Sequence, residues 1–321
     1  MYMTNKNNNK NILVIGSLNM DFVIEVDKMP VNKETVHGNT FTLVPGGKGA
    51  NEAYALGKMG ANVTMLGAVG KDEYGKTLIE NLKSVNVDTS KIKKVADVNT
   101  GCAFISVDKN GDNSITVVAG ANKSLTTDII DKNIKLIEDS DIIIMQLEIP
   151  IDVVTYAAKI AKEKGKLVIL DPAPAVNNIP KELLKNIDII KPNEIEIQVL
   201  TKVKVRKPKD LLKASYKLIE KGVSKVITTL GSQGAYLVTK DKYEYFKPIK
   251  VKAVDTTAAG DTFVAALVKS LMEEKTIEES IFYAIVASSI TVTKKGAQTS
   301  IPTLKEIEKK LKEIKNDKNN N

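Results

Sequence analysis

Short apolar runs alternate along the chain with polar segments in which apolar residues recur at helical spacing. Several of the runs are unbroken stretches of Ile, Val and Leu, which is typical of strands buried on both faces of a parallel sheet. The alternation predicts an α/β fold, with a doubly wound, mainly parallel sheet flanked by helices. The runs that we predict to be strands are 12–16, 63–69, 142–147, 167–171, 187–190 and 225–230.

The segments between these strands predict amphipathic helices. In 152–164 the apolar side chains form one stripe, and the same spacing recurs in 260–274. The last predicted helix starts near Thr303, with Glu306 three residues later, which is a capping-box pattern.

Two stretches, 22–45 and 99–118, break this rhythm because they look like strands with no helix between them. We expect them to form a small accessory sheet beside the main one. The remaining pattern predicts a single domain over 12–315, with polar, Asn-rich tails at 1–11 and 316–321 that we expect to be flexible.

Composition narrows the possible chemistry. The chain has 321 residues, enough to bury a core without disulfides or structural metals. It contains one cysteine and one histidine, which excludes zinc sites built from several of either residue. Scarce cysteine favours a reducing compartment, and no apolar run approaches the ~20 residues that span a bilayer. We therefore expect a cytoplasmic protein without a membrane partner.

The formal net charge of +8 does not indicate a nucleic-acid partner. Part of the excess lies in the two polar ends, where Lys6 and Lys10 and the lysines of 305–321 outnumber the acids. Among the 47 basic residues only Arg206 is arginine, whereas reading of base edges relies on arginine. A lysine-rich solvated surface explains the charge.

Residues 70–77 match the phosphate-binding pattern G-x4-G-K-[ST]. Asp72 and Glu73 would place two negative charges beside the phosphates. We therefore interpret Asp72 as the N-cap of a helix over 73–84, and the match as a coincidence.

The segment 44–51 reads VPGGKGAN and leads into a helix through Met59. Its glycines allow the backbone to approach a ligand closely, and Lys48 and Asn51 could hydrogen-bond hydroxyl groups. By itself the segment could equally be a tight turn. It is not the G-x-G-x-x-G motif, which disfavours a nicotinamide-linked oxidoreductase.

The segment 255–261 reads DTTAAGD and opens an amphipathic helix. Free N–H groups and the helix dipole make such a terminus an anion site. Asp261 lies in the first helical turn, where a lone acid would ordinarily only stabilise the dipole. Next to an anion site, its carboxylate is placed to deprotonate a hydroxyl that attacks a phosphoryl group. A protein that only binds its ligand would not need this base.

Polar side chains also follow several predicted strands, at the edge of the sheet where open α/β proteins bind ligands. Each alone could be loop polarity or a helix cap. Together they favour a ligand site. The residues are Asn19, Asp21, Glu148, Asn193, Glu196 and 229–234.

Two motifs together, PGGKGAN at 45–51 and DTTAAGDTF at 255–263, resemble the two signatures of the ribokinase-type carbohydrate kinases. The segments GSLNMD, MQLE, PAPA, KPNEIE, TLGSQG and KGAQTSIP resemble segments of the family in the same order. The resemblance covers about Asn11 to Lys315. It implies a ribokinase-like fold with a β lid over the sugar, matched by 22–45 and 99–118, and a homodimer formed through the lid.

The resemblance implies ATP-dependent phosphorylation of D-ribose at its O5 hydroxyl, with deoxyribose, fructose or adenosine as alternative acceptors. Asp261 would be the general base, and the N–H groups of Ala258, Ala259, Gly260 and Asp261 would form the anion hole. The implied sugar-binding residues are Asn19, Asp21, Gly47, Lys48, Gly49, Ala50, Asn51, Glu148 and Asp261.

The resemblance also implies the nucleotide and ion contacts. ATP would contact Asn193, Thr229, Leu230, Gly231, Ser232, Gln233, Gly234, Gly260 and Ile285. Glu196 matches an N-x-x-E element linked indirectly to Mg²⁺. An activating K⁺ would be held, partly through carbonyl groups, by Asp255, Thr257, Thr291, Lys294, Gly296 and Ser300.

The chain departs from the family pattern at two positions. Ile285 stands where some relatives have a histidine near the adenine, and Asp171 replaces an asparagine common before PAPA. Neither position is part of the implied base or anion hole. Because of these two departures, the sequence does not determine which nucleotide the protein prefers.

Overall fold

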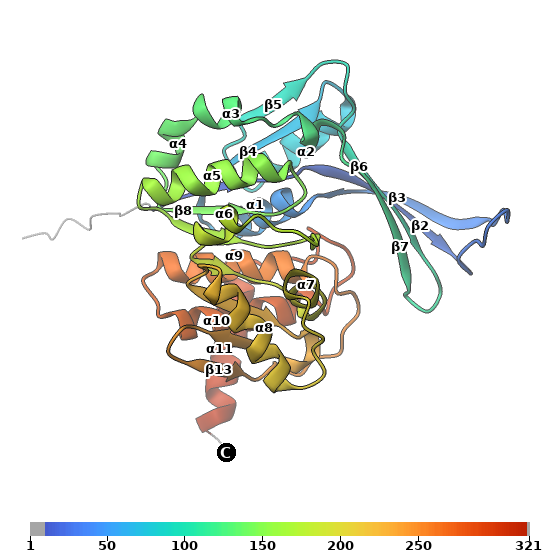
Figure 1. The fold of residues 1–321 in the computed structure, drawn as a ribbon. Helices are drawn as coiled ribbons and strands as arrows, with labels where there is room; N and C mark the ends of the chain where they lie inside the picture. The colour runs from blue at the N-terminus through green and yellow to red at the C-terminus, as the bar shows by residue number, and fades with distance from the viewer. Residues whose placement is uncertain (1–9, 320–321) are drawn as a thin grey trace, which may run out of the picture.

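A nine-stranded sheet forms the centre of the computed structural model, which describes residues 10–319 (Figure 1). Its strand order is β13-β12-β11-β10-β9-β8-β1-β4-β5. All neighbours from β11 to β5 are parallel, and β12 and β13 add an antiparallel edge. The strands are β1 (Asn11–Ile15), β4 (Asn62–Gly70), β5 (Ile92–Val95), β8 (Ile142–Met145), β9 (Leu167–Leu170), β10 (Ile189–Ile190), β11 (Lys225–Thr229), β12 (Ala235–Val238) and β13 (Tyr243–Phe246).

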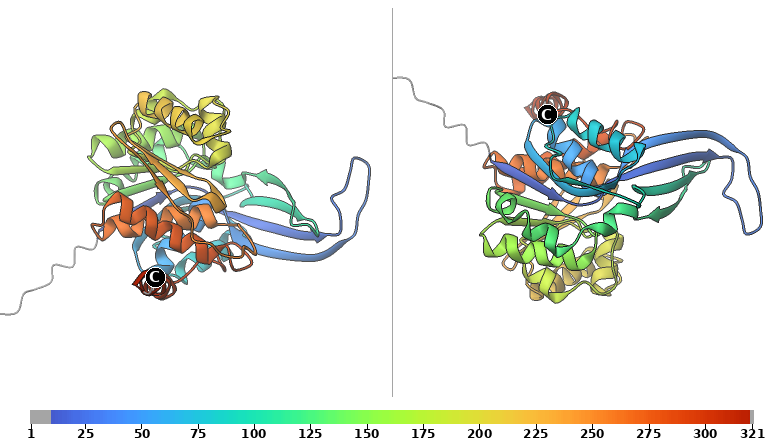
Figure 2. Two further views of the ribbon diagram at one scale, coloured as in Figure 1. Left: turned by 90° about the horizontal axis from the view of Figure 1, so that it is seen from below. Right: turned by 90° about the horizontal axis from the view of Figure 1, so that it is seen from above.

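Helices cover both faces of this sheet, as the two views of Figure 2 show. Because side chains alternate along a strand, Ile12 and Val14 of β1 join one core, and Leu13 and Ile15 join the other. The first core contains α1 (Lys48–Lys58), α2 (Glu73–Lys83), α9 (Ala259–Met272), α10 (Ile277–Thr291) and α11 (Leu304–Asn319). The second contains α3 (Thr127–Asp131), α4 (Ile134–Glu138), α5 (Ile151–Glu163), α6 (Lys181–Lys185), α7 (Glu194–Thr201) and α8 (Pro208–Glu220).

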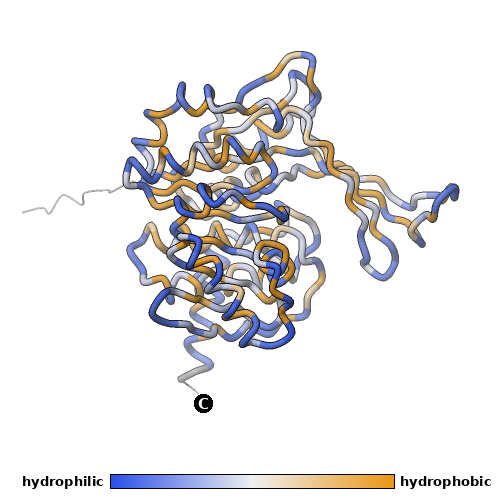
Figure 3. Tube along the Cα trace, viewed as in Figure 1, coloured by the Kyte–Doolittle hydropathy of each residue, from blue (hydrophilic) through white to orange (hydrophobic). Residues whose placement is uncertain are grey.

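A second sheet of four strands projects from the body (Figure 1). Its order is β3-β2-β6-β7, and apolar residues run along it as they do through the body (Figure 3). This confirms the accessory sheet that the sequence predicts. The strands are β2 (Asn19–Val26), β3 (Gly38–Gly46), β6 (Gly101–Val107) and β7 (Asn113–Val118).

The fold class predicted from the sequence is confirmed, and so are several helix termini. Asp72 caps α2 by accepting a hydrogen bond from Gly75 N at 2.7 Å, and Glu306 bonds to Thr303 N at 2.7 Å. The phosphate-binding pattern at 70–77 is thus the start of a helix, as interpreted above. Gly70 N is also occupied, because it donates to Thr100 Oγ1 at 3.0 Å.

Some elements differ from the prediction. The edge strands β12 and β13 and the short β5 were not predicted, because four-residue strands carry little periodicity. Of the expected tails, residues 1–9 and 320–321 lie outside the described residues. Asn11 pairs with Asn62 in the sheet. Residues 316–319 continue α11, which ends at Asn319.

This topology positions the site. Parallel strands end at one edge of the sheet, so the loops after β1, β8, β9, β10 and β11 converge there. Helices α1 and α9 pack against each other on the same side. Within 10–319, none of the helices is both long and apolar enough to cross a membrane.

Candidate active site

A cleft of about 930 Å³ opens at this edge of the sheet. Its wall includes the start of α9, the loops after β9, β10 and β11, and part of α10. Among its lining residues are Lys48, Asp171, Lys191, Asn193, Glu196, Thr229, Gly231, Ser232, Gly234, Ala258, Gly260, Asp261 and Ile285. The structure therefore brings most of the sequence-predicted nucleotide and base residues into one cavity.

The N-terminus of α9 faces this cleft. Ala258 caps it with a φ of 59°, a left-handed conformation that side chains rarely adopt, and this turns the chain sharply into the helix. The N–H groups in the first turn of a helix have no partner within the helix. Gly260 and Asp261 lie in this turn. Ala259, which we expected in the anion hole, instead donates to Thr256 O at 3.2 Å.

Asp261 is 5% exposed, and its carboxylate is held from two sides. Asn51 Nδ2 donates to Oδ2 at 2.7 Å, and Lys48 Nζ lies 3.9 Å from Oδ1. Burial alone would lower the pKa of Lys48, but Asp261 and other carboxylates outweigh it and raise the pKa above its usual value. The ammonium therefore stays charged beside the carboxylate. Gln298, which the sequence did not single out, donates to Asn51 Oδ1 at 3.0 Å.

The glycine motif brings α1 against the loop after β1. A Cβ on Gly49 would lie 2.7 Å from Ser17 N and 2.8 Å from the Gly16 backbone, so only glycine fits. This close approach allows Ala50 N to donate to Ser17 O at 2.9 Å. Gly47, at a φ of 88°, turns the chain into α1.

Glu148 lies under the start of α1. Its Oε2 accepts a hydrogen bond from Lys48 N at 3.1 Å and another from Ser17 Oγ. Asn19 begins the second sheet, and its Oδ1 accepts from Asn122 Nδ2 at 2.8 Å. Asn122 also bonds to the backbone of Leu18, so it positions Asn19 through contacts that the sequence analysis did not predict.

Asp21 extends from the second sheet toward the glycine motif. A Cβ on Gly46 would lie 2.2 Å from its Oδ2, so the carboxyl group covers the backbone there. Burial, together with the nearby charges of Glu148 and Asp261, raises the pKa of Asp21 to about 7. The glycine motif, both sheets and α9 thus meet where the carboxyl groups of Asp21, Glu148 and Asp261 lie close together.

The predicted nucleotide contacts divide between two cavities. Asn193 and Glu196 line the main cleft and form the capping box of α7, through Asn193 Oδ1 and Glu196 Oε2. Leu230 and Gln233, by contrast, line a neighbouring cavity of about 360 Å³ together with Ser232. The family resemblance implies that both contact ATP, and this stays a prediction, since neither is among the residues that line the main cleft.

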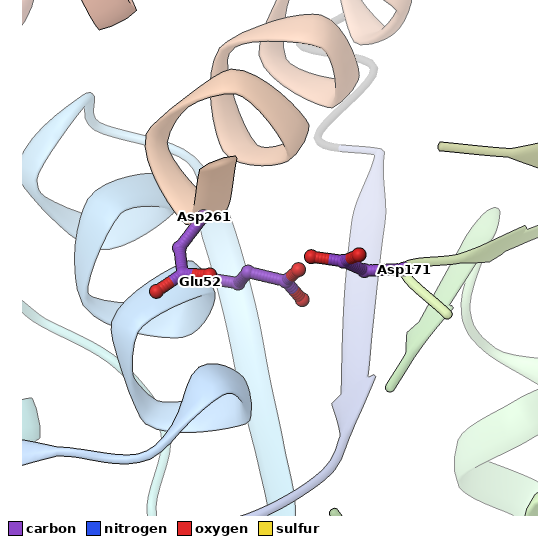
Figure 4. A group of neighbouring side chains, drawn as sticks. All are labelled: Glu52, Asp171 and Asp261. Carbon is purple, nitrogen blue, oxygen red and sulfur yellow. The ribbon is translucent and has the colours of Figure 1, made fainter. Parts of the chain in front are cut away.

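A buried polar cluster includes Asp261 and was largely missed by the sequence analysis (Figure 4). Glu52 and Asp171 point toward one another, and their carboxyl oxygens lie within 4.8 Å of an oxygen of Asp261. Gln146 Nε2 donates to Glu52, and Lys191 Nζ donates to Asp171 at 3.0 Å. Burial, followed by the charges of Asp171 and Asp261, raises the pKa of Glu52 well above its usual range.

The expected cation residues lie on two loops that touch. Asp255 accepts hydrogen bonds from Thr257 N and from Gly296 N, both at 2.9 Å. Some of the side chains have other partners. Thr291 bonds to Thr262, Lys294 pairs with Glu306, and Ser300 bonds to Ala297 O. At Lys294 only the carbonyl group is a candidate ligand, because an ammonium has no lone pair, whereas the hydroxyl oxygens of Thr291 and Ser300 remain candidates besides their carbonyl groups.

Comparisons with known proteins agree with this architecture. The family model of pfkB family carbohydrate kinases matches residues 9–304. The ribokinase of Haemophilus influenzae is 42% identical over 92% of this chain and 97% of its own length. The deoxyribokinase of Salmonella typhi is 33% identical over 94% of this chain and 98% of its own length. The structure of Arabidopsis thaliana ribokinase complexed with ribose and ATP has a TM-score of 0.89 at 35% identity, covering 94% of this chain and 99% of that one.

These matches extend over almost all of the chain and over both sheets. They include the two glycine-containing motifs that meet at Asp261. The chain belongs to the pfkB family of carbohydrate kinases.

Proposed function

We propose that the protein phosphorylates D-ribose at O5 with ATP, giving D-ribose 5-phosphate and ADP. One observation carries the proposal: a buried carboxylate, Asp261, lies in the first turn of α9 at the wall of a cleft large enough for a nucleotide. Relatives named ribokinase, one of them solved with ribose and ATP, favour ribose as the acceptor.

Different residues around the cleft accept the proton, stabilise the transferred phosphoryl group and position the base. The Asp261 carboxylate accepts the proton of the O5 hydroxyl as the O5–phosphorus bond forms and the bond from γ-phosphorus to the ADP oxygen breaks. The N–H groups of Gly260 and Asp261, at the positive end of the helix dipole, stabilise the negative charge of the transferring group. Asn51 and Lys48 hold the carboxylate in position.

The sugar side and the nucleotide side come from different parts of the chain. Asn19, Asp21 and Glu148 supply hydrogen-bonding groups beside the glycine motif, where hydroxyl groups of a sugar would bind. Asn193 and the loop after β11 line the nucleotide side. Because both sheets contribute to this one site, we treat 12–315 as a single catalytic domain. We place the protein in the cytoplasm because scarce cysteine favours a reducing compartment.

Glu196 fits an indirect role with Mg²⁺, because its carboxylate lines the cleft and its capping bond uses only Oε2. When bound, Mg²⁺ would neutralise charge on the phosphate oxygens.

A coupled ADP-release assay with MgATP and K⁺ tests the proposal across ribose, deoxyribose, fructose, adenosine and no sugar. Turnover strongest with ribose supports it. The deoxyribokinase relative makes deoxyribose the second candidate, and preferential turnover of deoxyribose would change the substrate but keep the mechanism. A wild-type protein without sugar-dependent ADP release would refute the proposed activity.

The loops joined by Asp255 fit a monovalent cation, since the bond from Gly296 N brings their carbonyl groups together. K⁺ would stabilise the loop that leads into the anion hole. We expect activity to fall several-fold when tetramethylammonium replaces K⁺ at equal ionic strength, because the larger ion does not fit between carbonyl groups. Equal rates in both salts would contradict this site. Asp255→Asn should weaken the response to K⁺.

The second sheet exposes apolar side chains that suit a homodimer. Ile115 and Val117 share one face of β7, and each is 52% exposed. Exposed contiguous apolar surface favours association, and we infer that a second copy covers it.

We expect sedimentation velocity to give a dimer for the wild type and a monomer after the double substitution Ile115→Asp and Val117→Asp, because two buried carboxylates would oppose the contact. Tyr243→Asp is the matched control, as Tyr243 is 60% exposed on the edge strand β13 of the main sheet. A wild-type monomer at assay concentration, or a dimer that survives the double substitution, would exclude this interface.

A further inference from the structure

Lys191 and Asp171 form an ion pair that is buried at the edge of the main sheet. They directly follow the parallel neighbours β10 and β9, and Lys191 N donates to Leu170 O at 3.0 Å. The ammonium lies 3.0 Å from Asp171 Oδ2, and the side chains are 4% and 1% exposed. A pair this deeply buried is costly to desolvate, so its presence calls for an explanation beyond stability.

The ammonium of Lys191 also reaches the catalytic end of the cleft. A Cβ built on Gly260 would lie 3.2 Å from Lys191 Nζ, so the ammonium lies against the first turn of α9. Gly260 is adjacent to Asp261, and Lys191 itself lines the cleft. A pair that served only to link β9 and β10 would not need to place its cation there.

The charges around Lys191 keep it protonated. Burial alone would lower its pKa, but Asp171 and Glu196 outweigh burial and the pKa is raised. An ammonium group has three N–H donors, and Asp171 Oδ2 accepts one of them. The others are available to an anion in the cleft.

We propose that Lys191 contacts the transferring phosphoryl group, and that Asp171 is a positioning residue that holds the ammonium against the start of α9. The inference rests on the proposed kinase function and deepens it. The lysine adds a full positive charge to the N–H groups of Gly260 and Asp261, where the transition state gathers negative charge. It also explains why an acid follows β9: a neutral side chain would hold the cation less firmly.

The first test is Lys191→Met, which keeps the aliphatic length and removes the charge. We expect kcat to fall roughly a hundredfold, the scale of losing one transition-state donor. MgATP titrated calorimetrically without sugar should bind more weakly, whereas AMP, which lacks the distal phosphates, should bind as to the wild type. Lys162→Met is the matched control, because Lys162 pairs with Asp188, which precedes β10 at the opposite end of the strand.

The double variant Asp171→Asn with Lys191→Met separates a contact with phosphate from a structural role. It removes both charges, so no uncompensated carboxylate stays buried, and it decides the question if Lys191→Met alone does not fold. We expect it to melt near the wild-type temperature while kcat and the preference for ATP over AMP stay low. Recovery of wild-type kcat and ATP affinity would show that the pair is structural and overturn the proposal.

The single variant Asp171→Asn retains the lysine. We expect a smaller loss of kcat than for Lys191→Met, because the ammonium remains but is less well positioned. A loss larger than that of Lys191→Met would contradict the assignment. The calorimetric comparison of ATP and AMP uses no sugar, so it tests Lys191 even if the wild type fails to phosphorylate ribose.

Discussion

Asp261→Asn should reduce kcat by roughly 10²- to 10⁴-fold while leaving the affinity for ribose largely intact. The amide has the same shape as the carboxylate, and its oxygen can still accept the hydrogen bond from Asn51 Nδ2 that is 2.7 Å long in the wild type. It cannot accept the O5 proton, so the attacking oxygen stays a poor nucleophile. The measurement is steady-state kinetics with ribose and MgATP each varied, together with ribose binding in the absence of ATP.

Glu148→Gln provides the comparison for loss of a carboxylate in the same site. Glu148 bonds to Lys48 N and Ser17 Oγ on the sugar side and has no place in the proton transfer. We expect it to raise KM for ribose with a smaller effect on kcat. An Asp261→Asn variant with near-normal turnover would refute the role of the base.

The sequence was sufficient to predict the layered fold and the position of Asp261 at the start of a helix. Buried strands such as β8 and β9 are continuous apolar runs, and a helix start such as Thr303 with Glu306 is encoded within four residues. The position of Asp261 in the first turn of α9, where we propose an anion site, was predictable for the same reason. It depends on a helix N-terminus and on neighbours in the chain, and so it is a local property.

The contacts that connect distant segments were not predictable in this way. Asn51 is predicted to bind sugar hydroxyl groups, but nothing in the sequence indicates that its side chain also joins Asp261, 210 positions away, to Gln298, 247 positions away. The pair of Lys191 with Asp171 depends on β9 and β10 being neighbours in register. Such partners follow from the order of the strands and from packing, and no motif records them.

The loop after β11 lines two different cavities, and this too depends on three-dimensional structure and not on a sequence motif. Its residues are contiguous, but Leu230 and Gln233 line the neighbouring cavity, Gly231 and Gly234 line the main cleft, and Ser232 of the 3₁₀ turn lines both. The family resemblance implies one nucleotide site for all of them. Which cavity each residue lines depends on the backbone geometry of this turn, and the ATP contacts of Leu230 and Gln233 stay a prediction.

Asp21 should make sugar recognition depend on pH near neutrality. Its pKa is raised to about 7 by burial and by the charges of Glu148 and Asp261. Above this pH the group is a carboxylate that can accept hydrogen bonds from two sugar hydroxyl groups. Below it, the group carries a proton and loses acceptor capacity. Because the folded protein favours the protonated form relative to an ordinary aspartate, the loss begins near pH 7 and not near pH 4.

We therefore expect kcat/KM for ribose, which reports the free enzyme, to fall by roughly tenfold per pH unit below about pH 7. In Asp21→Asn the value should be lower at neutral pH but should not show this inflection, because the amide does not titrate. Saturating MgATP in both enzymes removes the titration of the nucleotide from the comparison. If the variant kept the inflection of the wild type, another group would be responsible, and Asp21 would bind the sugar in a form that does not change with pH.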